Sequence, residues 1–435
     1  MRHGSSPPHG RRRGRALVAA AITAAALAAF TAPAFATDGQ DNSGSGGSNC
    51  QDVDTTVPGS ALAAQAAPLP PVPGVTDGPP LAIHGKLCLP DGATPQTVML
   101  ALHGITYTSS YWNAEPPVAN ADKYNFSKAM NKGGYAVFAI DRLGYGDSAH
   151  PTPEAVTLDV QAEVAHQLIG QLRDGKIGDT AFPHVALVGH SYGTATSWRE
   201  TAKYNDADAV IGTGWGNTIQ TEPLARFFSG FYPAAADVAP PQGKEAKFRS
   251  LPPGYLTPMP GGRDKDFLYR LENSDPAVRD YDATVLRDTV TDGEGVTFYN
   301  RYGAFPDAKL GGAELNLPLS DQTKNISVPT FQINGQYELF FCGPNQERCQ
   351  SSQALTNGES AKYWTDKACF LAGVTPDAGH NLNLQENAPF TYDTVLKFAD
   401  KALGPDGANK DSYRSSCAAE TGQNVPDDTP QFGAK

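Results

Sequence analysis

The chain has 435 residues, of which 40% are hydrophobic and 18% are charged, a balance that argues against a disordered protein. The length allows one large domain with insertions or two ordinary domains. With 46 acidic and 34 basic residues, the formal net charge is -12, which argues against nucleic acid and anionic membranes as partners.

The N-terminus has the composition of an export signal. Four arginines between positions 11 and 15 precede the apolar stretch "ALVAAAITAAALAAF", which is followed by "TAPAFAT". This order predicts a secretory signal peptide at residues 1–36, with cleavage after Ala36. A membrane anchor is the alternative, but the apolar stretch is shorter than the roughly 20 residues that span a bilayer. We therefore expect a secreted, extracellular protein that keeps no integral membrane segment.

Low-complexity segments are expected at both ends of the mature chain. Residues 37–78 are rich in Gly, Ser, Ala and Pro and lack apolar periodicity, which predicts a flexible leader. Residues 404–435 are similarly polar and predict a C-terminal tail, although Cys417 offers a way to tie it to the body.

Six cysteines are an even number in a chain that is expected to be exported, where disulfides persist. Three bridges are plausible, with about fifteen possible connectivities. Cys342 and Cys349 flank the short segment "GPNQER", so a local bridge is expected between them; the alternative is that each pairs elsewhere. No cysteine has the spacing of a zinc site, and we expect neither a metal nor a cofactor.

Between the two ends, short apolar runs alternate with longer helical patterns. Strands are predicted at residues 81–89, 97–102, 135–140, 184–189, 209–214, 328–334 and 369–374. Helices are predicted at residues 157–175 and 388–403, where apolar residues recur at helical spacing. This alternation predicts a mostly parallel sheet with helices on both faces, built from a first part at 79–220 and a second part at 326–403.

Residues 221–325 interrupt the alternation with Pro, Gly and aromatic residues, as in "LARFFSGFYP". The segment lies between two predicted strands, so we expect an insertion over one edge of the sheet, either a cap or a long irregular excursion. Insertions of this kind often shape binding sites. The aromatic residues of residues 221–325 indicate either an apolar or aromatic substrate, or a core that belongs to the insertion itself.

The segment "LVGHSYGTAT" places Ser191 between two glycines at the end of a predicted strand. A strand that ends in Gly-x-Ser-x-Gly and turns directly into a helix puts the serine at a sharp corner, with its hydroxyl above the sheet. A side chain at Gly189 or Gly193 would collide with neighbouring backbone as the turn closes. The motif is weak by itself, because short motifs recur by chance.

A serine hydroxyl needs a base to take its proton, and the base needs an acid that orients it. His380, in "VTPDAGHNLNL", follows the last predicted strand, so a loop presents it at the carboxyl edge of the sheet. The alternative is an ordinary histidine on a surface loop. Glu338, in "FQINGQYELFFC", follows another strand and is the expected acid, with Asp366 and Asp377 as its rivals. The chain order of serine, acid and histidine is the one expected of a hydrolase built on such a sheet.

An oxyanion hole is the remaining requirement, a pair of backbone donors placed where negative charge develops. The segment "LALHGITYTSSYW" ends the second predicted strand with His103 and Gly104, and the glycine lets the next N–H turn inward. The expected donors are the N–H groups of Ile105 and Tyr192. His103 is expected to shape its loop.

The substrate pocket is expected to include three aromatic or imidazole side chains. Tyr107 and Trp112 follow the oxyanion segment and His190 precedes the serine, where it is expected to pack beneath the corner. Aromatic residues are core residues almost as often as pocket residues, so a purely structural role is the alternative for each.

Together these motifs resemble the α/β-hydrolase superfamily, and in particular its secreted serine esterases and lipases. The motifs are "HG" at 103–104, "DRLGYGDS" at 141–148, "GHSYG" at 189–193, the acid in "NGQYE" and "AGHN" at 378–381. The resemblance implies a mostly parallel sheet of about eight strands, with helices on both faces and a cap after the sixth strand. It also implies that Asp141 and Arg142 belong to the scaffold. The sequence departs from the commoner pattern in having Glu as the acid.

The leading hypothesis is a secreted serine hydrolase that cleaves a small-molecule carboxylic ester through an acyl-enzyme. An amidase, a peptidase or an acyltransferase would use the same three residues, and the sequence leaves these alternatives open. A hypothesis from another class is a non-catalytic binding module that kept the fold and lost the chemistry.

Overall fold

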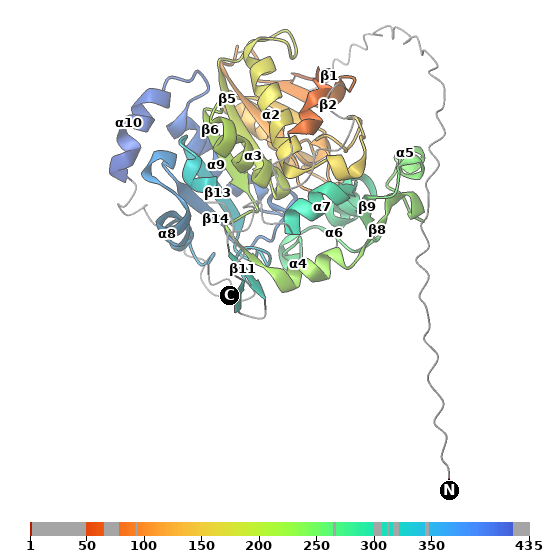
Figure 1. Cartoon of the computed structure of the whole chain (residues 1–435). Coiled ribbons are helices and arrows are strands. Elements are labelled where there is room, and N and C mark those ends of the chain that lie inside the picture. Colours follow the sequence, from red (N-terminus) through yellow and green to blue (C-terminus); the bar gives the residue numbers. More distant parts are fainter. Residues whose placement is uncertain are drawn as a thin grey trace. The chain divides into compact units, whose positions relative to one another are not determined.

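An eight-stranded sheet organises the chain (Figure 1). The computed structural model describes Met1 and residues 49–64, 78–92, 94–263, 267–299, 307–310, 313–315, 322–343 and 348–420. The expected signal peptide at residues 1–36 lies outside the described residues. Residues from Gly47 onward form one unit, to which the following description refers.

The sheet is mostly parallel, as the sequence predicts. Its strands lie in the order β1 (Asn49–Val57), β2 (Leu81–Leu89), β4 (Ala136–Ile140), β3 (Thr97–Leu102), β5 (His184–His190), β6 (Ala209–Thr213), β13 (Thr330–Gly335) and β14 (Leu371–Thr375). β2 is antiparallel to both of its neighbours, and the remaining neighbours are parallel. Each of the seven predicted strands matches an observed strand to within two residues.

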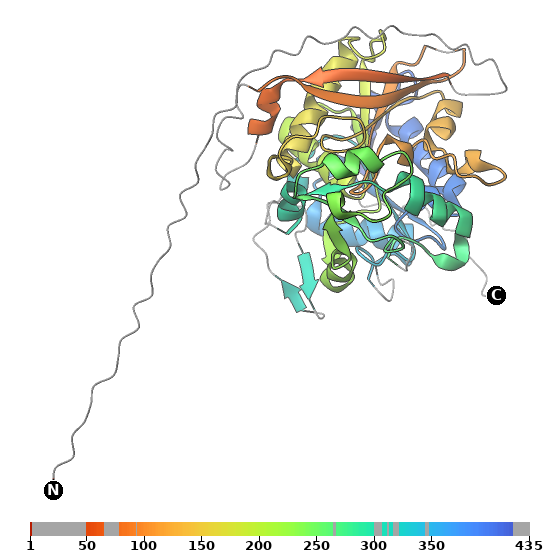
Figure 2. The ribbon, with the colours of Figure 1, turned by 90° about the vertical axis from the view of Figure 1, so that its right-hand side faces the viewer.

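Helices cover both faces of the sheet. The helices outside the insertion are α1 (Phe126–Lys132), α2 (Leu158–Arg173), α3 (Tyr192–Tyr204), α8 (Ser352–Tyr363), α9 (Ala388–Ala402) and α10 (Lys410–Glu420). α2 packs on α3, α1 packs on α9, and Figure 2 shows these two pairs on opposite faces. Because both faces are covered, the central strands β3 and β4 are buried along their whole length and are continuously apolar or nearly so.

The predicted helices correspond to α2 and α9. α2 begins after Thr157, whose side-chain oxygen accepts a hydrogen bond from the N–H of Val160. Val164, Leu168 and Leu172 follow on one face and are buried, and each such side chain contributes about 1.5–3 kcal/mol by leaving water.

The expected flexible leader, residues 37–78, contains a strand that the sequence analysis missed. Asn49–Val57 form β1, which pairs antiparallel with β2 over nine residues. The strand is at the edge of the sheet and is mostly exposed, so it has little apolar alternation for a sequence pattern to reveal. Its content of Thr and Val, which are enriched in strands, could have indicated a strand here.

The expected polar tail is likewise part of the body up to residue 420. α10 buries Tyr413 and Cys417, and the carbonyl of Pro405 accepts hydrogen bonds from Gln96 and Thr97 at the start of β3. The sequence analysis did not predict this helix, because only two of its described side chains are buried and its composition is therefore mostly polar.

All six cysteines form disulfides, Cys50–Cys88, Cys342–Cys349 and Cys369–Cys417. The expected local bridge between Cys342 and Cys349 is confirmed, and Cys417 ties the C-terminal segment to the body. None of the described helices is both long enough and apolar enough to cross a bilayer.

The insertion, residues 221–325, separates β6 from β13, and we call it the cap. Its described elements, with the preceding β7, are β7 (Thr218–Gln220), α4 (Thr221–Phe228), β8 (Phe231–Pro233), α5 (Glu245–Ser250), β9 (Tyr255–Pro258), α6 (Pro276–Tyr281), β10 (Val290–Thr291), α7 (Asp292–Tyr299), β11 (Asp307–Leu310) and β12 (Ala313–Leu315). Figure 1 shows α4 to α7 with β8 and β9 gathered on one side of the sheet. Ala234, Phe248, Leu251 and Tyr255 form a small core inside the cap, so the cap has a packed interior of its own.

A buried acid lies on α3. Glu200 is fully buried, and its carboxyl group faces that of Asp206, which also contacts His166. Burial, together with the neighbouring Asp206 carboxylate, raises the pKa of Glu200 to about 10. We therefore expect Glu200 to carry a proton at neutral pH.

Glu200→Gln is expected to stabilise the protein at pH 8, because the amide supplies a donor that alkaline pH does not remove. A carboxyl group whose pKa is raised by folding contributes most stability below its unfolded pKa, and the contribution falls as pH rises toward the folded pKa. The advantage of the variant in free energy of unfolding should therefore be smallest near pH 5, then grow by up to about 1.4 kcal/mol per pH unit. Urea unfolding followed by circular dichroism measures this difference.

Glu163→Gln on the neighbouring α2 is the matched control. Burial opposes ionisation of Glu163, but hydrogen bonds from Tyr204 and Gln167 outweigh it and lower the pKa. Its difference from the wild type should stay constant above pH 6. Parallel behaviour of the two variants would contradict the protonated state of Glu200.

Candidate active site

Ser191 occupies the corner between β5 and α3. Its φ of 52° and ψ of -122° lie in a region that a non-glycine residue occupies at a cost of about 1–3 kcal/mol. Backbone hydrogen bonds hold it there: the Ser191 N–H donates to the carbonyl of Thr213 at 2.8 Å, and the Ser191 carbonyl accepts from Thr194 at 2.8 Å. Strain of this kind persists only where the surrounding structure enforces it.

Three glycines let the backbone close around this corner. A Cβ atom on Gly193 would lie 2.0 Å from the carbonyl oxygen of Leu102, and one on Gly189 would lie 2.4 Å from the backbone nitrogen of Thr194. Both contacts are impossible, so the expectation that these positions require glycine is confirmed. A Cβ atom on Gly104 would lie 3.0 Å from the Cβ of Ser191. The segment after β3 therefore lies directly against the serine.

His380 and Glu338 lie on neighbouring loops at the carboxyl ends of β14 and β13. The Nδ1 atom of His380 is 2.5 Å from Oε2 of Glu338, and Oε1 of Glu338 accepts a hydrogen bond from the N–H of Phe340 at 2.9 Å. Glu338 is fully buried and His380 is 4% exposed. Glu338 therefore fixes the imidazole with Nδ1 toward the acid and leaves Nε2 for another partner.

The rival acids lie elsewhere. Asp377 is an exposed residue of the histidine loop, and its carboxylate lies 3.3 Å from Nε of Arg270. Asp366 begins a short helical turn before β14, at the opposite end of that strand from His380. Of the three acids considered from the sequence, the structure brings Glu338 to the histidine.

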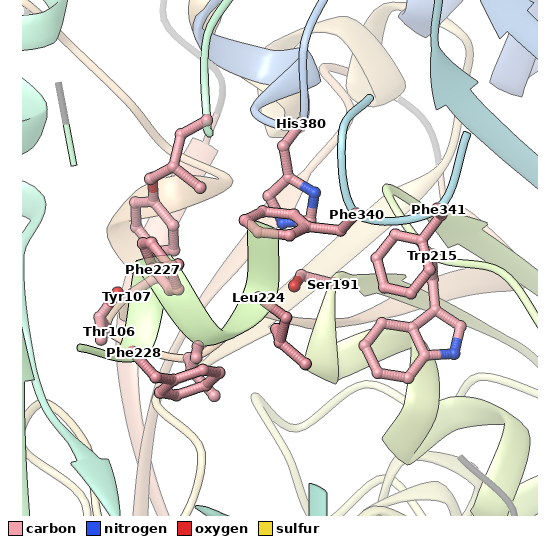
Figure 3. A pocket seen from close by; sticks show the side chains of 12 residues that line it. Thr106, Tyr107, Ser191, Trp215, Leu224, Phe227, Phe228, Phe340, Phe341 and His380 are labelled. Carbon is pink, nitrogen blue, oxygen red and sulfur yellow. The ribbon is translucent and has the colours of Figure 1, made fainter. Parts of the chain in front are cut away.

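Ser191 and His380 line the same pocket (Figure 3). The pocket encloses about 420 Å³ of empty space, its open mouth included. Its lining consists of Ile105, Thr106, Tyr107, Ser191, Trp215, Leu224, Phe227, Phe228, Leu268, Phe340, Phe341 and His380. Figure 3 shows Trp215 and Phe341 on one side of Ser191, with Tyr107 and Phe227 on the other. None of these side chains is an acid, a lysine or an arginine.

The expected oxyanion donors flank the serine. Ile105 lines the pocket directly after Gly104, and Tyr192 is the first residue of α3, where the helix directs its first N–H groups outward. Tyr107 also lines the pocket, as expected from the sequence.

Trp112 and His190 do not line the pocket, which corrects their assignment to substrate binding. Trp112 is fully buried and packs edge-on against Phe126, with ring centres 4.8 Å apart. His190 is also fully buried; it stacks on Tyr111 and contacts the hydroxyl of Thr213 at 3.0 Å. Burial, and then the nearby His380, lower the pKa of His190 well below its usual value, so it is a neutral packing residue. A sequence pattern of aromatic residues does not distinguish the core from a pocket wall.

Several pocket residues were not identified from the sequence, namely Thr106, Trp215, Leu224, Leu268, Phe340 and Phe341. Trp215 follows the end of β6, and the two phenylalanines follow the end of β13. Their position just beyond the carboxyl ends of parallel strands, where ligands bind in such sheets, was the available signal. Leu224 and Leu268 come from the cap, whose path over the sheet no local pattern encodes.

Asp141 and Arg142 belong to the scaffold, as the resemblance implied, and His103 shapes its loop, as expected from its segment. Arg142 donates from its backbone N–H to Nε2 of His103 and from its Nε to the carbonyl of His103. Burial, and then the charge of Arg142, lower the pKa of His103 well below its usual value. The carboxylate of Asp141 accepts from the N–H groups of Ser109 and Asp147 and so closes the turn after β4.

Two groups in the described part of the chain have side chains close enough to hold a metal ion. They are His84 with Asp141 and Asp147, and His166 with Glu200 and Asp206. Neither group includes a residue that lines the pocket.

Comparison with solved structures returns proteins of low sequence identity. The chain is similar to a monoacylglycerol lipase from Paleococcus ferrophilus, at 15% identity and a TM-score of 0.42, over 71% of this chain and 95% of that one. It is similar to a thermophilic esterase from Thermogutta terrifontis, at 17% identity and a TM-score of 0.41, over 80% and 98% of the two chains. An alpha/beta hydrolase from Penicillium sp. sh18 is similar at 14% identity and a TM-score of 0.45, over 81% and 98%.

No curated protein matches the chain. A family model described as the alpha/beta hydrolase family matches residues 99–391, which include Ser191, Glu338, His380 and all the residues that line the pocket. Since this match covers well over half of the sequence, the protein belongs to the α/β hydrolase family.

Proposed function

We propose that the protein is a secreted serine hydrolase that cleaves a carboxylic ester with an apolar acyl group. Ser191 is the nucleophile, His380 the base and Glu338 the acid that orients the base. The observation that carries this proposal is the 2.5 Å contact between Nδ1 of His380 and Glu338, on a histidine that shares the pocket of Ser191. A histidine held in this way has its second ring nitrogen available to take a proton.

In the proposed reaction, Oγ of Ser191 attacks the ester carbonyl carbon while Nε2 of His380 takes the hydroxyl proton. The N–H groups of Ile105 and Tyr192 stabilise the negative charge on the carbonyl oxygen, and Glu338 stabilises the positive imidazolium. The carbon–oxygen bond to the alcohol breaks as His380 returns the proton to it. Water, activated by His380, then hydrolyses the acyl-enzyme and regenerates Ser191.

The pocket wall supports an ester in preference to a peptide. A peptide chain carries N–H and C=O groups that cost about 1–3 kcal/mol each if they are buried without a partner. Aromatic and aliphatic side chains dominate this wall, and charged recognition groups are missing from it. An ester with an apolar acyl chain makes no such demand.

Export is supported by the cysteines. Their pairing into three disulfides is typical of proteins that fold in an oxidising compartment. Such bridges are rare in cytosolic proteins.

Ser191→Ala is expected to abolish both hydrolysis of p-nitrophenyl butyrate and covalent labelling by a fluorophosphonate probe. Glu338→Gln should lower kcat by about 10³–10⁴-fold, because the histidine loses its orienting charge. Steady-state kinetics and gel fluorescence measure these effects, and the melting temperature shows that each variant is folded. Ser110→Ala, at an exposed serine near the site, should behave as the wild type. Undiminished labelling of Ser191→Ala would overturn the proposal.

The apolar wall should also set substrate preference. An ester of butyrate should be cleaved at least about 100-fold faster, by kcat/KM, than the corresponding hemisuccinate, because the succinyl carboxylate would enter the pocket without a partner.

Leu224→Ala should move the preference toward longer acyl chains by removing a side chain from the pocket wall.

Leu251→Ala in the small core of the cap is the control for Leu224→Ala. Leu251 is buried to a similar degree, and both truncations should destabilise the protein by about 2–4 kcal/mol. Leu251→Ala should leave the chain-length profile unchanged, since Leu251 does not line the pocket. Equal profiles for both variants would count against an acyl site beneath α4.

A further inference from the structure

A buried ion pair lies at the base of the cap. The guanidinium of Arg263 and the carboxylate of Asp282 are 2.6 Å apart at their closest atoms, and both side chains are 1% exposed. Burial opposes the positive charge of Arg263, but the Asp282 carboxylate outweighs it and raises the pKa of the guanidinium. Burying two charges costs free energy even when they are paired. The other hydrogen bonds of Arg263 and Asp282 therefore indicate which parts of the structure the pair holds in place.

Arg263 reaches from the cap to the segment that carries one proposed oxyanion donor. Its NH1 atom donates to the carbonyl oxygen and to Oγ1 of Thr106, each at 2.5 Å. The guanidinium also lies over the ring of Tyr107, 3.9 Å from its centre. Thr106 and Tyr107 directly follow Ile105, and all three line the pocket.

Thr106 has a backbone conformation that threonine does not adopt unaided. Its φ is 61°, in the left-handed region, where a β-branched residue is an outlier. The cap supplies the partners of its backbone: the Thr106 N–H donates to the carbonyl of Thr289, and the Thr106 carbonyl accepts from the N–H of Asp288, both at 2.9 Å. Three polar atoms of one strained residue are thus bonded to the cap.

The same ion pair also reaches the histidine loop. Oδ2 of Asp282 accepts hydrogen bonds from the hydroxyl groups of Tyr269, at 2.8 Å, and Tyr107, at 3.3 Å. The side-chain amide of Asn381, the residue after His380, donates to the Tyr107 hydroxyl at 2.6 Å. Tyr107 therefore connects the ion pair of the cap to the residue beside the proposed base.

We propose that Arg263 is a positioning residue that holds Thr106 in its left-handed conformation, so that the N–H of Ile105 faces the oxyanion formed at Ser191. This inference rests on the proposed function. Release of Thr106 would let the backbone after Gly104 relax toward an ordinary conformation and move the Ile105 donor. An oxyanion donor acts mainly in the transition state, so the loss should fall on kcat and spare KM.

Arg263→Lys tests this role, because a lysine ammonium cannot bridge Asp282 and both oxygens of Thr106 in the geometry of a guanidinium. We expect kcat for p-nitrophenyl butyrate to fall by about 10–100-fold, with KM within about threefold of the wild type. Affinity for a trifluoromethyl ketone, whose adduct with Ser191 places an oxyanion in the hole, should fall by the same factor as kcat/KM.

Arg287→Lys is the matched control. Arg287 is equally buried, pairs with Asp237 at 2.7 Å and donates to the carbonyl oxygens of Pro258 and Ala239 within the cap. It should lower the melting temperature as Arg263→Lys does, yet keep kcat within about twofold of the wild type. Similar kcat losses in both variants, or a folded Arg263→Lys variant with normal kcat, would overturn the inference.

Thr106→Val provides a second route if Arg263→Lys does not fold. It keeps the shape of the side chain and the Arg263–Asp282 pair but removes the Oγ1 acceptor, and should lower kcat by about tenfold with KM unchanged. A normal kcat here would also overturn the inference.

The failure of this inference and the failure of the proposed function give different results. If Ser191→Ala loses activity while the positioning variants keep a normal kcat, this inference alone is rejected. If the wild type has no activity that depends on Ser191, the proposed function and this inference are rejected together.

Discussion

The geometry of the site depends on one close backbone contact, the approach of α3 to the end of β3. Gly193 lies so near the Leu102 carbonyl that no side chain fits between them, and this contact forces the chain to turn at Ser191 within a single residue. Because β3 and β5 are adjacent and parallel, the same contact brings the segment after β3 against the serine. The serine and the backbone at Ile105 are therefore positioned by the sheet itself, whereas His380 and Glu338 are brought in by loops from two strands farther along it.

The cap does more than cover this site, because it also holds the segment after β3 in place. Two of its buried ionic contacts reach the segment between β3 and the pocket, one on each side of Gly104. Glu294 of α7 pairs with Arg142, which holds His103, and Asp282 pairs with Arg263, which holds Thr106. Core and cap are thus joined by the Arg142–Glu294 pair, whose separation would leave unpaired buried ions, and by the hydrogen bonds of Arg263 to Thr106. The pocket wall combines residues from both parts for the same reason.

The sequence predicted the elements whose signal is local. Continuous apolar runs revealed β3, β4 and β5, and the glycines around Ser191 revealed the corner, because a backbone collision depends only on neighbours in the chain and in the sheet. Glu338 was identified from its position after a strand, and the structure places it on His380. The exposed strand β1 gave no apolar pattern, and Trp112 resembled a pocket residue because an aromatic side chain looks the same in a core. The contact of Arg263 with Thr106 spans 157 positions, and no local pattern could have revealed it.

The disulfides occupy informative places in the sheet. Cys50–Cys88 fastens β1, which is one edge strand, and Cys369 precedes β14, the other edge strand, and binds it to α10. A sheet of this kind frays from its margins, where a strand has a neighbour on one side only. With both margins cross-linked, peeling of an outer strand is blocked as a first step of denaturation. Opening must then begin by rupture of the interior, a slower event that lengthens the lifetime of the folded protein.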